Sequence, residues 1–153
     1  MEGVEKLGEI LVVEDDPEDR QLMKKALEVS HWANELHFVE DGEEALDYLY
    51  YRGKYSDPAS APRPGLLLLD LNLPKKNGLE VLQEIKADPT LRSLPVIVFT
   101  TSQATEDIQA CYDVGANSYI SKPNTFVGLV KAMQTLGQYW FGIVELPPVV
   151  RRG

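Results

Sequence analysis

Five short apolar segments recur along this chain, and each is followed by a stretch with helical periodicity. They cover residues 9–14, 35–39, 66–71, 95–100 and 118–121. Strand-length apolar segments that alternate with helices predict repeated βα units and a mostly parallel sheet. The unbroken leucines from Leu66 to Leu69 are typical of a strand that is buried on both faces. We therefore predict an α/β fold, a doubly wound sandwich of five strands and five helices.

Helix-start and helix-stop signals occupy the segments between these strands. The predicted helices begin near Asp16, Asp41, Asn77, Gln103 and Asn124. Asp16 and Asp41 can each accept a hydrogen bond from the first helical turn, and Pro17 suits the first helical position. Pro89 ends the third helix and Gly115 closes the fourth. Each predicted strand is thus followed by one helix.

Length and charge limit the functions that this chain can have. We expect residues 1–153 to form a single domain, with a core at about 8–138 and an apolar C-terminal extension at 139–153. The formal net charge of −9 argues against direct binding of nucleic acid. No apolar stretch is long enough to span a membrane and no signal peptide is evident, so we expect a cytoplasmic protein. Cys111, the sole cysteine, cannot form an internal disulfide.

Two segments interrupt the regular alternation. Residues 52–65 contain three prolines and two glycines, which predicts an irregular loop whose role the sequence leaves open. Residues 139–148 are rich in aromatic and apolar side chains, although the five-helix pattern is complete before them. This extension either caps the domain's own core or provides a surface for self-association.

Acidic residues follow two of the predicted strands. Glu14 and Asp15 end the first apolar segment, and Asp70 ends the leucine run. In an open α/β sheet, ligands bind beyond the carboxyl ends of the strands. Three carboxylates brought together there repel one another unless a cation neutralises them. The sequence therefore predicts a divalent metal site formed by Glu14, Asp15 and Asp70.

The acids belong to a dispersed signature that extends over four loops. Its members are Glu14 and Asp15, then Asp70, then Thr100, and finally Lys122 with Pro123. In this combination the chain resembles the receiver domain of two-component response regulators over nearly its whole length. The resemblance implies a flavodoxin-like sheet of five parallel strands in the order 2-1-3-4-5, with the site between the first and third strands.

The resemblance also implies roles for the signature residues. Asp70 would be the phosphoacceptor, with Mg²⁺ as the cofactor. Asp15, Asp70 and the main-chain carbonyl of Asn72 would bind this ion directly, and Glu14 would bind it through water. Lys122 would pair with Asp70 and later with the phosphoryl group.

Further residues would couple the site to an output surface. Thr100 and Thr101 lie in the predicted phosphate-binding and switch segment, and Thr100 is expected to act together with Tyr119. Asn72 and Ser102 would tune dephosphorylation. Pro123 would form a cis peptide bond that aims Lys122 inward. The output surface would comprise the fourth helix, the fifth strand and the fifth helix.

Within this family, the chain most resembles the small free-standing regulators of cyanobacterial phytochromes. The features concerned are residues 51–55, 70–78, 100–102 and 140–148. This resemblance implies a phytochrome-like histidine kinase as partner. It also implies a homodimer formed through the last strands, the last helix and the C-terminal extension.

Other functions fit the sequence less well. Phosphatases and mutases with an aspartate nucleophile need a second aspartate two positions later, where this chain has Asn72. A receiver-shaped docking module that works without phosphorylation is the main alternative, although it leaves the full signature unexplained. Neither His31 nor His37 shows metal-ligand spacing, so we expect ordinary surface or packing roles for both. We predict a signalling switch and not a conventional enzyme.

Overall fold

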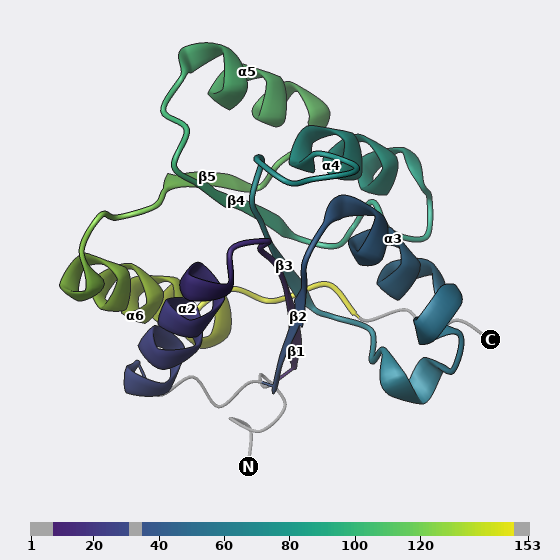
Figure 1. The fold of residues 1–153 in the computed structure, drawn as a ribbon, viewed down its shortest axis with the longest axis horizontal. Helices are drawn as coiled ribbons and strands as arrows, with labels where there is room; N and C mark the ends of the chain where they lie inside the picture. The colour runs from purple at the N-terminus through teal and green to yellow at the C-terminus, as the bar shows by residue number, and fades with distance from the viewer. Residues whose placement is uncertain (1–7, 31–34, 149–153) are drawn as a thin grey trace.

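The computed structural model describes residues 8–30 and 35–148, which form a sheet with helices on both faces (Figure 1). The strands are β1 (Glu9–Val13), β2 (Glu35–Val39), β3 (Leu66–Leu69), β4 (Val96–Thr100) and β5 (Ser118–Ser121). The α-helices are α2 (Pro17–Val29), α3 (Gly42–Tyr50), α4 (Gly78–Ala87), α5 (Thr105–Val114) and α6 (Phe126–Gly142). Strands and helices alternate, as the sequence predicts.

The sheet has the order β2-β1-β3-β4-β5, and every neighbouring pair is parallel. This confirms the predicted flavodoxin-like topology. The chain moves outward from β1 to β2 and then crosses back to β3, so β1 and β3 lie side by side at the point where the winding reverses. Side chains that follow these two strands therefore face a common crevice.

The helix boundaries follow local capping chemistry. The Asp16 carboxylate accepts a hydrogen bond from the Glu18 N–H at 2.9 Å, as expected for the residue that begins α2. Asn77 and Glu80 form a reciprocal capping box at the start of α4. The last helix begins after Thr125, two residues later than Asn124 predicts, because the Thr125 hydroxyl accepts a hydrogen bond from the Gly128 N–H at 3.0 Å.

Residues 52–65 are more ordered than the predicted irregular loop. They contain two short 3₁₀-helices, η1 (Gly53–Tyr55) and η2 (Pro58–Ser60). The Tyr48 hydroxyl donates a hydrogen bond to the Pro62 carbonyl at 2.8 Å, and the Tyr55 hydroxyl donates to the Glu44 carboxylate at 2.6 Å. One bond comes from each half of the loop, so both halves of the loop are attached to α3.

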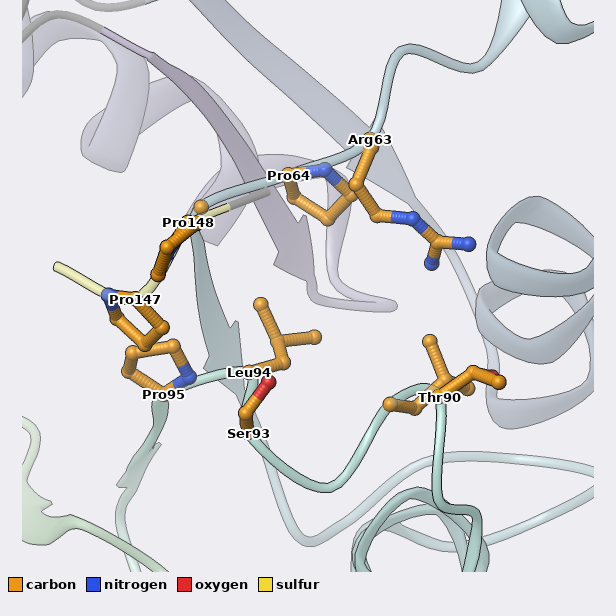
Figure 2. A pocket seen from close by; sticks show the side chains of 10 residues that line it. Arg63, Pro64, Thr90, Ser93, Leu94, Pro95, Pro147 and Pro148 are labelled. Atoms are coloured by element: carbon orange, nitrogen blue, oxygen red, sulfur yellow. The ribbon is translucent and has the colours of Figure 1, made fainter. Parts of the chain in front are cut away.

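A pocket lies at the end of the sheet where β3 and β4 begin. Pro64, Pro95, Pro147 and Pro148 line one part of it, and Arg63 lies alongside (Figure 2). The C-terminal extension therefore crosses the amino ends of the central strands. This is the end of the sheet opposite to the predicted phosphoacceptor.

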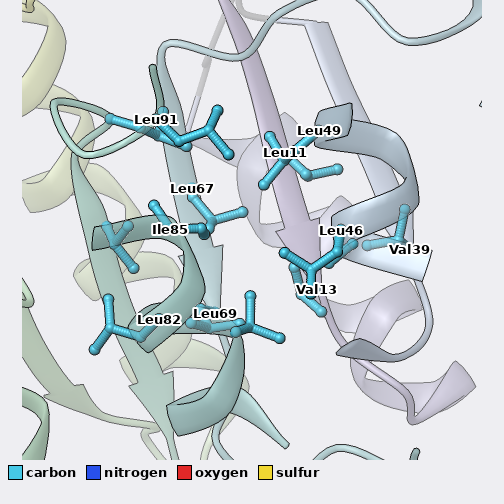
Figure 3. Close-up of a cluster of buried hydrophobic side chains, with 14 of the residues drawn as sticks. Leu11, Val13, Val39, Leu46, Leu49, Leu67, Leu69, Leu82, Ile85 and Leu91 are labelled. Carbon is cyan, nitrogen blue, oxygen red and sulfur yellow. The ribbon is translucent and has the colours of Figure 1, made fainter. Parts of the chain in front are cut away.

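The sheet separates two apolar cores because successive side chains on each strand point to opposite faces. Leu11 and Leu67 point toward α3 and α4, where they meet Leu46 and Ile85 (Figure 3). The alternate side chains, such as Ile10 on β1, face α2 and α6. β3 is buried on both faces, as its unbroken run of leucines predicts.

The C-terminal extension begins as the last turn of α6. Trp140 is only 7% exposed and belongs to the core beneath α2 and α6, and Phe141, Val144 and Leu146 pack against the same core. Ile143, in contrast, is 70% exposed. The extension therefore caps the domain's own core, which was one of the two alternatives that the sequence left open. No helix within the described ranges is long and apolar enough to span a membrane.

Candidate functional site

Glu14 and Asp70 lie next to each other because of the β1–β3 register. Val13 pairs with Leu69 at the carboxyl ends of these strands, so the following residues emerge together. The Asp70 N–H donates a hydrogen bond to the Val13 carbonyl at 3.2 Å, and the Glu14 N–H donates to the Val39 carbonyl at 3.0 Å. Main-chain hydrogen bonds thus hold both acids at the crevice where the winding reverses.

The three predicted acids form one cluster. Carboxylate oxygens of Glu14, Asp15 and Asp70 all lie within 4.8 Å of one another. Glu14 and Asp70 are buried, whereas Asp15 is exposed to solvent. Burial removes the water that would otherwise screen these charges, so the cluster requires a nearby cation.

Lys122 supplies a fixed cation to this cluster. Its Nζ lies 3.0 Å from Asp70 Oδ2 and also contacts Glu14 Oε1. A third carboxylate, that of Asp19 on α2, lies 3.3 Å away. Asp19 is not among the predicted site residues; it lies in the first turn of α2, and the helix geometry brings it to the site. The Lys122 main-chain N–H donates to the Thr100 carbonyl at 2.7 Å, which fixes the start of the lysine side chain.

The electrostatics of Glu14 and Lys122 reflect their burial and their contact. The net pKa of Glu14 is raised to about 7: burial is the main cause and the charge of Asp70 adds to it, whereas the contact with Lys122 opposes both effects. Burial alone would lower the pKa of Lys122, but the contacts with Glu14 and Asp70 outweigh it and the net pKa is raised. Lys122 therefore remains an ammonium at neutral pH.

The expectation of a cis peptide bond before Pro123 is wrong, since every peptide bond in residues 8–30 and 35–148 is trans. Lys122 points into the site without a cis bond. Its ammonium is drawn inward by the buried carboxylates of Glu14 and Asp70, and its backbone is held by Thr100.

The predicted switch residues form a chain of hydrogen bonds away from the acids. Thr100 is completely buried at the end of β4, and its hydroxyl accepts a bond from the Ser102 N–H at 3.5 Å. The Tyr119 hydroxyl donates to the Ser102 carbonyl at 2.9 Å. The Ser102 hydroxyl donates to the Asp107 carboxylate on α5 at 2.6 Å. Thr101 lies in the same segment and is exposed.

Asn72 and Gly78 shape the loop that follows Asp70. The Asn72 N–H donates to Asp70 Oδ1 at 3.1 Å, and the Asn72 side chain is exposed beside the acid. A Cβ on Gly78 would lie 2.2 Å from the Asp70 carbonyl oxygen, so only glycine permits this packing. Gly78 therefore positions Asp70, a role that the sequence did not reveal.

The donor set fits a hard divalent cation. All three acids offer carboxylate oxygens, which are the ligands that Mg²⁺ prefers, and the exposed Asp15 leaves space for the water that Mg²⁺ retains. Glu14, Asp15 and Asp70 can therefore hold such an ion together with water.

The sequence from residue 10 to residue 134 matches the family of response regulator receiver domains. The chain belongs to this family. A receiver domain acts as a signalling switch in two-component pathways and not as a conventional enzyme. The acidic pocket of Glu14, Asp15 and Asp70 is consistent with the phosphoacceptor site of the family.

Individual relatives support the same assignment. The receiver is 42% identical to the response regulator Rcp1 of Synechocystis over 90% of this chain and 92% of Rcp1. The Mn²⁺-bound structure of Rcp1 matches with a TM-score of 0.83 at 41% identity, over 92% of this chain and 99% of that one. The phosphorylated form of RcpA, a cyanobacterial phytochrome response regulator, matches with a TM-score of 0.86 at 42% identity, over 93% and 99%.

Proposed function

We propose that this receiver accepts a phosphoryl group on Asp70 from a phytochrome-like histidine kinase, with Mg²⁺ as its cofactor. The observation that carries the proposal is the position of Asp70, buried between two other carboxylates and 3.0 Å from the Lys122 ammonium. A carboxylate in this position faces a cation that can receive phosphoryl oxygens. The relatives Rcp1 and RcpA support the phytochrome-like identity of the kinase.

Each residue of the site has a distinct task in this proposal. An oxygen of the Asp70 carboxylate attacks the phosphorus of the donor, and the bond from phosphorus to the donor histidine breaks. Asp15, Asp70 and the Asn72 carbonyl would hold Mg²⁺ directly, and Glu14 would hold it through water. When bound, the ion neutralises negative charge on the phosphoryl oxygens. Lys122 moves from the Asp70 carboxylate to a phosphoryl oxygen.

Thr100 connects phosphorylation to the output surface. We propose that its buried hydroxyl turns toward the new phosphoryl group and that the Tyr119 ring then moves inward. The bond from Tyr119 to the Ser102 carbonyl links this movement to the segment before α5. The output surface then comprises α5, β5 and α6.

The neighbouring polar residues set access to Asp70 and the lifetime of the phosphorylated form. Thr101 lies exposed beside the buried Thr100, where it can restrict entry or contact the phosphoryl group. Asn72 and Ser102 lie in the loops that follow β3 and β4, from which they would control an attacking water. The Ser102 hydroxyl donates a hydrogen bond to Asp107 on α5. This bond supports the proposal that control of dephosphorylation by Ser102 depends on the position of α5.

We also propose that the receiver forms a homodimer through β5, α6 and the C-terminal extension. Ile143 and Val127 leave large apolar side chains exposed at 70% and 67% on this part of the molecule. Light scattering after size exclusion should give a dimer mass for the unmodified chain and a monomer mass for Ile143→Asp. A monomer mass for both proteins contradicts this proposal and leaves the phosphoacceptor proposal intact.

Phosphorylation is tested by mixing the protein with Mg²⁺ and a small acyl phosphate and recording the intact mass. We expect the addition of one phosphoryl group, which Asp70→Asn abolishes and EDTA prevents. Asp113→Asn, which changes an exposed acid on α5, is the matched control and should react like the unmodified protein. A phosphoryl adduct that persists in Asp70→Asn removes Asp70 from its assigned role.

Kinase specificity and the docking alternative are tested together. A phytochrome-like histidine kinase, labelled on its histidine, should transfer label to the receiver and not to Asp70→Asn. If the receiver binds such a kinase but accepts label neither from it nor from the acyl phosphate, the chain is a docking module. Transfer from the acyl phosphate alone refutes only the identity of the kinase.

A further inference from the structure

We propose that Glu9, Glu35 and His37 form a second divalent-metal site, which takes a borderline ion such as Zn²⁺. The site lies at the amino ends of β1 and β2, whereas the phosphoacceptor lies beyond the carboxyl ends of the strands. It does not depend on the proposed phosphorylation of Asp70.

Strand pairing brings the three side chains together. Glu9 pairs directly with Glu35 across the parallel β1–β2 ladder, and Leu11 pairs with His37. Because side chains two residues apart on a strand share a face, Glu35 and His37 point to the same side of the sheet as Glu9. More than twenty residues separate Glu9 from the other two along the chain, so no ligand spacing is visible in the sequence.

The side-chain atoms already lie close to a coordinating arrangement. The His37 Nε2 lies 2.5 Å from Glu9 Oε1, and one ligand atom from each of the three residues lies within 4.8 Å of the others. Zn²⁺ binds histidine nitrogen and carboxylate oxygen at about 2.0–2.2 Å, so small rotations of the glutamates suffice to enclose one ion. The ion then replaces the proton that links His37 to Glu9.

The surroundings hold the imidazole in place and leave the site accessible. The Tyr48 ring lies behind His37, with 5.9 Å between the ring centroids. The Tyr48 hydroxyl donates to the Pro62 carbonyl and so does not occupy the His37 nitrogen. The His37 and Glu9 side chains remain 25% and 29% exposed, which allows an ion to enter from solvent.

Charge and donor chemistry together identify the class of ion. Two adjacent carboxylates repel each other, so Glu9 and Glu35 favour a cation between them. An imidazole ligand suits Zn²⁺ and other late transition metals, whereas Mg²⁺ prefers oxygen alone. Three protein ligands leave a fourth tetrahedral position for water. The bound ion would connect the start of β1 to the edge strand β2.

The test follows the two histidine side chains by NMR during a titration of metal-free protein with Zn²⁺. His31→Gln assigns the imidazole signals, because His31 and His37 are the only histidines in the sequence. We expect saturable shifts of the His37 signals with Zn²⁺ and none with Mg²⁺. Glu35→Gln changes an exposed side chain and should weaken this binding by about tenfold or more.

Controls separate this site from the other acidic pocket. Glu43→Gln removes an exposed acid on α3 and should leave the Zn²⁺ affinity measured at His37 unchanged. Asp15→Asn alters the phosphoacceptor pocket and should also leave it unchanged. The proposal would be overturned if the His37 signals do not shift with Zn²⁺. It would also be overturned if Zn²⁺ shifts them with the same affinity in Glu35→Gln as in the unmodified protein.

Discussion

Replacing Lys122 by methionine tests how the buried acids of the receiver are stabilised. The Lys122 side chain is 9% exposed, and its closest acids are buried to a similar degree. At the observed 3.0 Å between Lys122 Nζ and Asp70 Oδ2, two charges attract by about 5 kcal/mol at an effective dielectric constant of ~20. Desolvation offsets part of this attraction in the native protein. Methionine keeps the length of the side chain but leaves two buried carboxylates without their cation.

We expect Lys122→Met to lose about 3–5 kcal/mol of unfolding free energy in EDTA, which is typical when one partner of a buried ion pair is removed. For a chain of this size, this corresponds to a fall in Tm of roughly 6–20 °C. Mg²⁺ should raise the Tm of Lys122→Met more than that of the unmodified receiver. Without the ammonium, the ion meets no competing cation in the pocket, so it binds the native state more tightly.

The assay is thermal unfolding followed by circular dichroism, with and without Mg²⁺. Lys131→Met, which removes an exposed lysine on α6, is the matched control and should change the Tm little under either condition. Equal stability of Lys122→Met and the unmodified receiver in EDTA would refute the reasoning. So would an equal Mg²⁺-induced rise in Tm for these two proteins.

Three further predictions concern packing and reactivity. Gly78→Ala places a Cβ 2.2 Å from a backbone carbonyl oxygen and should cost about 1–3 kcal/mol in urea unfolding, whereas Gly142→Ala, with no atom near its Cβ, should cost nothing. Trp140→Ala should cost about 3–5 kcal/mol in the same assay because the side chain is 7% exposed, and Ile143→Ala, at 70% exposed, should cost far less. Burial raises the pKa of Cys111 to about 11, so at pH 8 the thiol stays protonated and iodoacetamide should modify the urea-unfolded protein but not the native one, as judged by intact mass. Equal losses within either pair of variants, or rapid alkylation of the native protein, would contradict these predictions.

The C-terminal extension shows where sequence periodicity stops being informative. Its aromatic and apolar residues could serve an internal core or a second molecule, and the composition is the same in both cases. The structure turns Trp140 and Leu146 onto the core beneath α2 and α6 while Ile143 faces outward. Which side chains are buried depends on how far α6 continues, and the helical pattern of its early turns does not specify that.

The acidic pocket of Glu14, Asp15 and Asp70 was largely predictable because these residues stand at strand ends. An acid that follows a buried apolar run indicates where the strand ends. Because the carboxyl ends of parallel strands lie at the same edge of a sheet, the sequence predicts that Glu14 and Asp70 lie at one edge. The order of the strands came from the family resemblance and not from the pattern of residues. Asp19 and Gly78 escaped notice because an acid in a first helical turn and a glycine before a helix are common features.

The amino-acid sequence alone determined the alternation of strands and helices, most helix starts and the position of the central strand, because these depend on periodicity and local hydrogen bonding. Tertiary structure decided which distant charges meet. It placed Lys122 against Glu14 and Asp70, and it aligned Glu9 with Glu35 beside His37. Such contacts follow from strand order and register, which arise only when the whole chain packs.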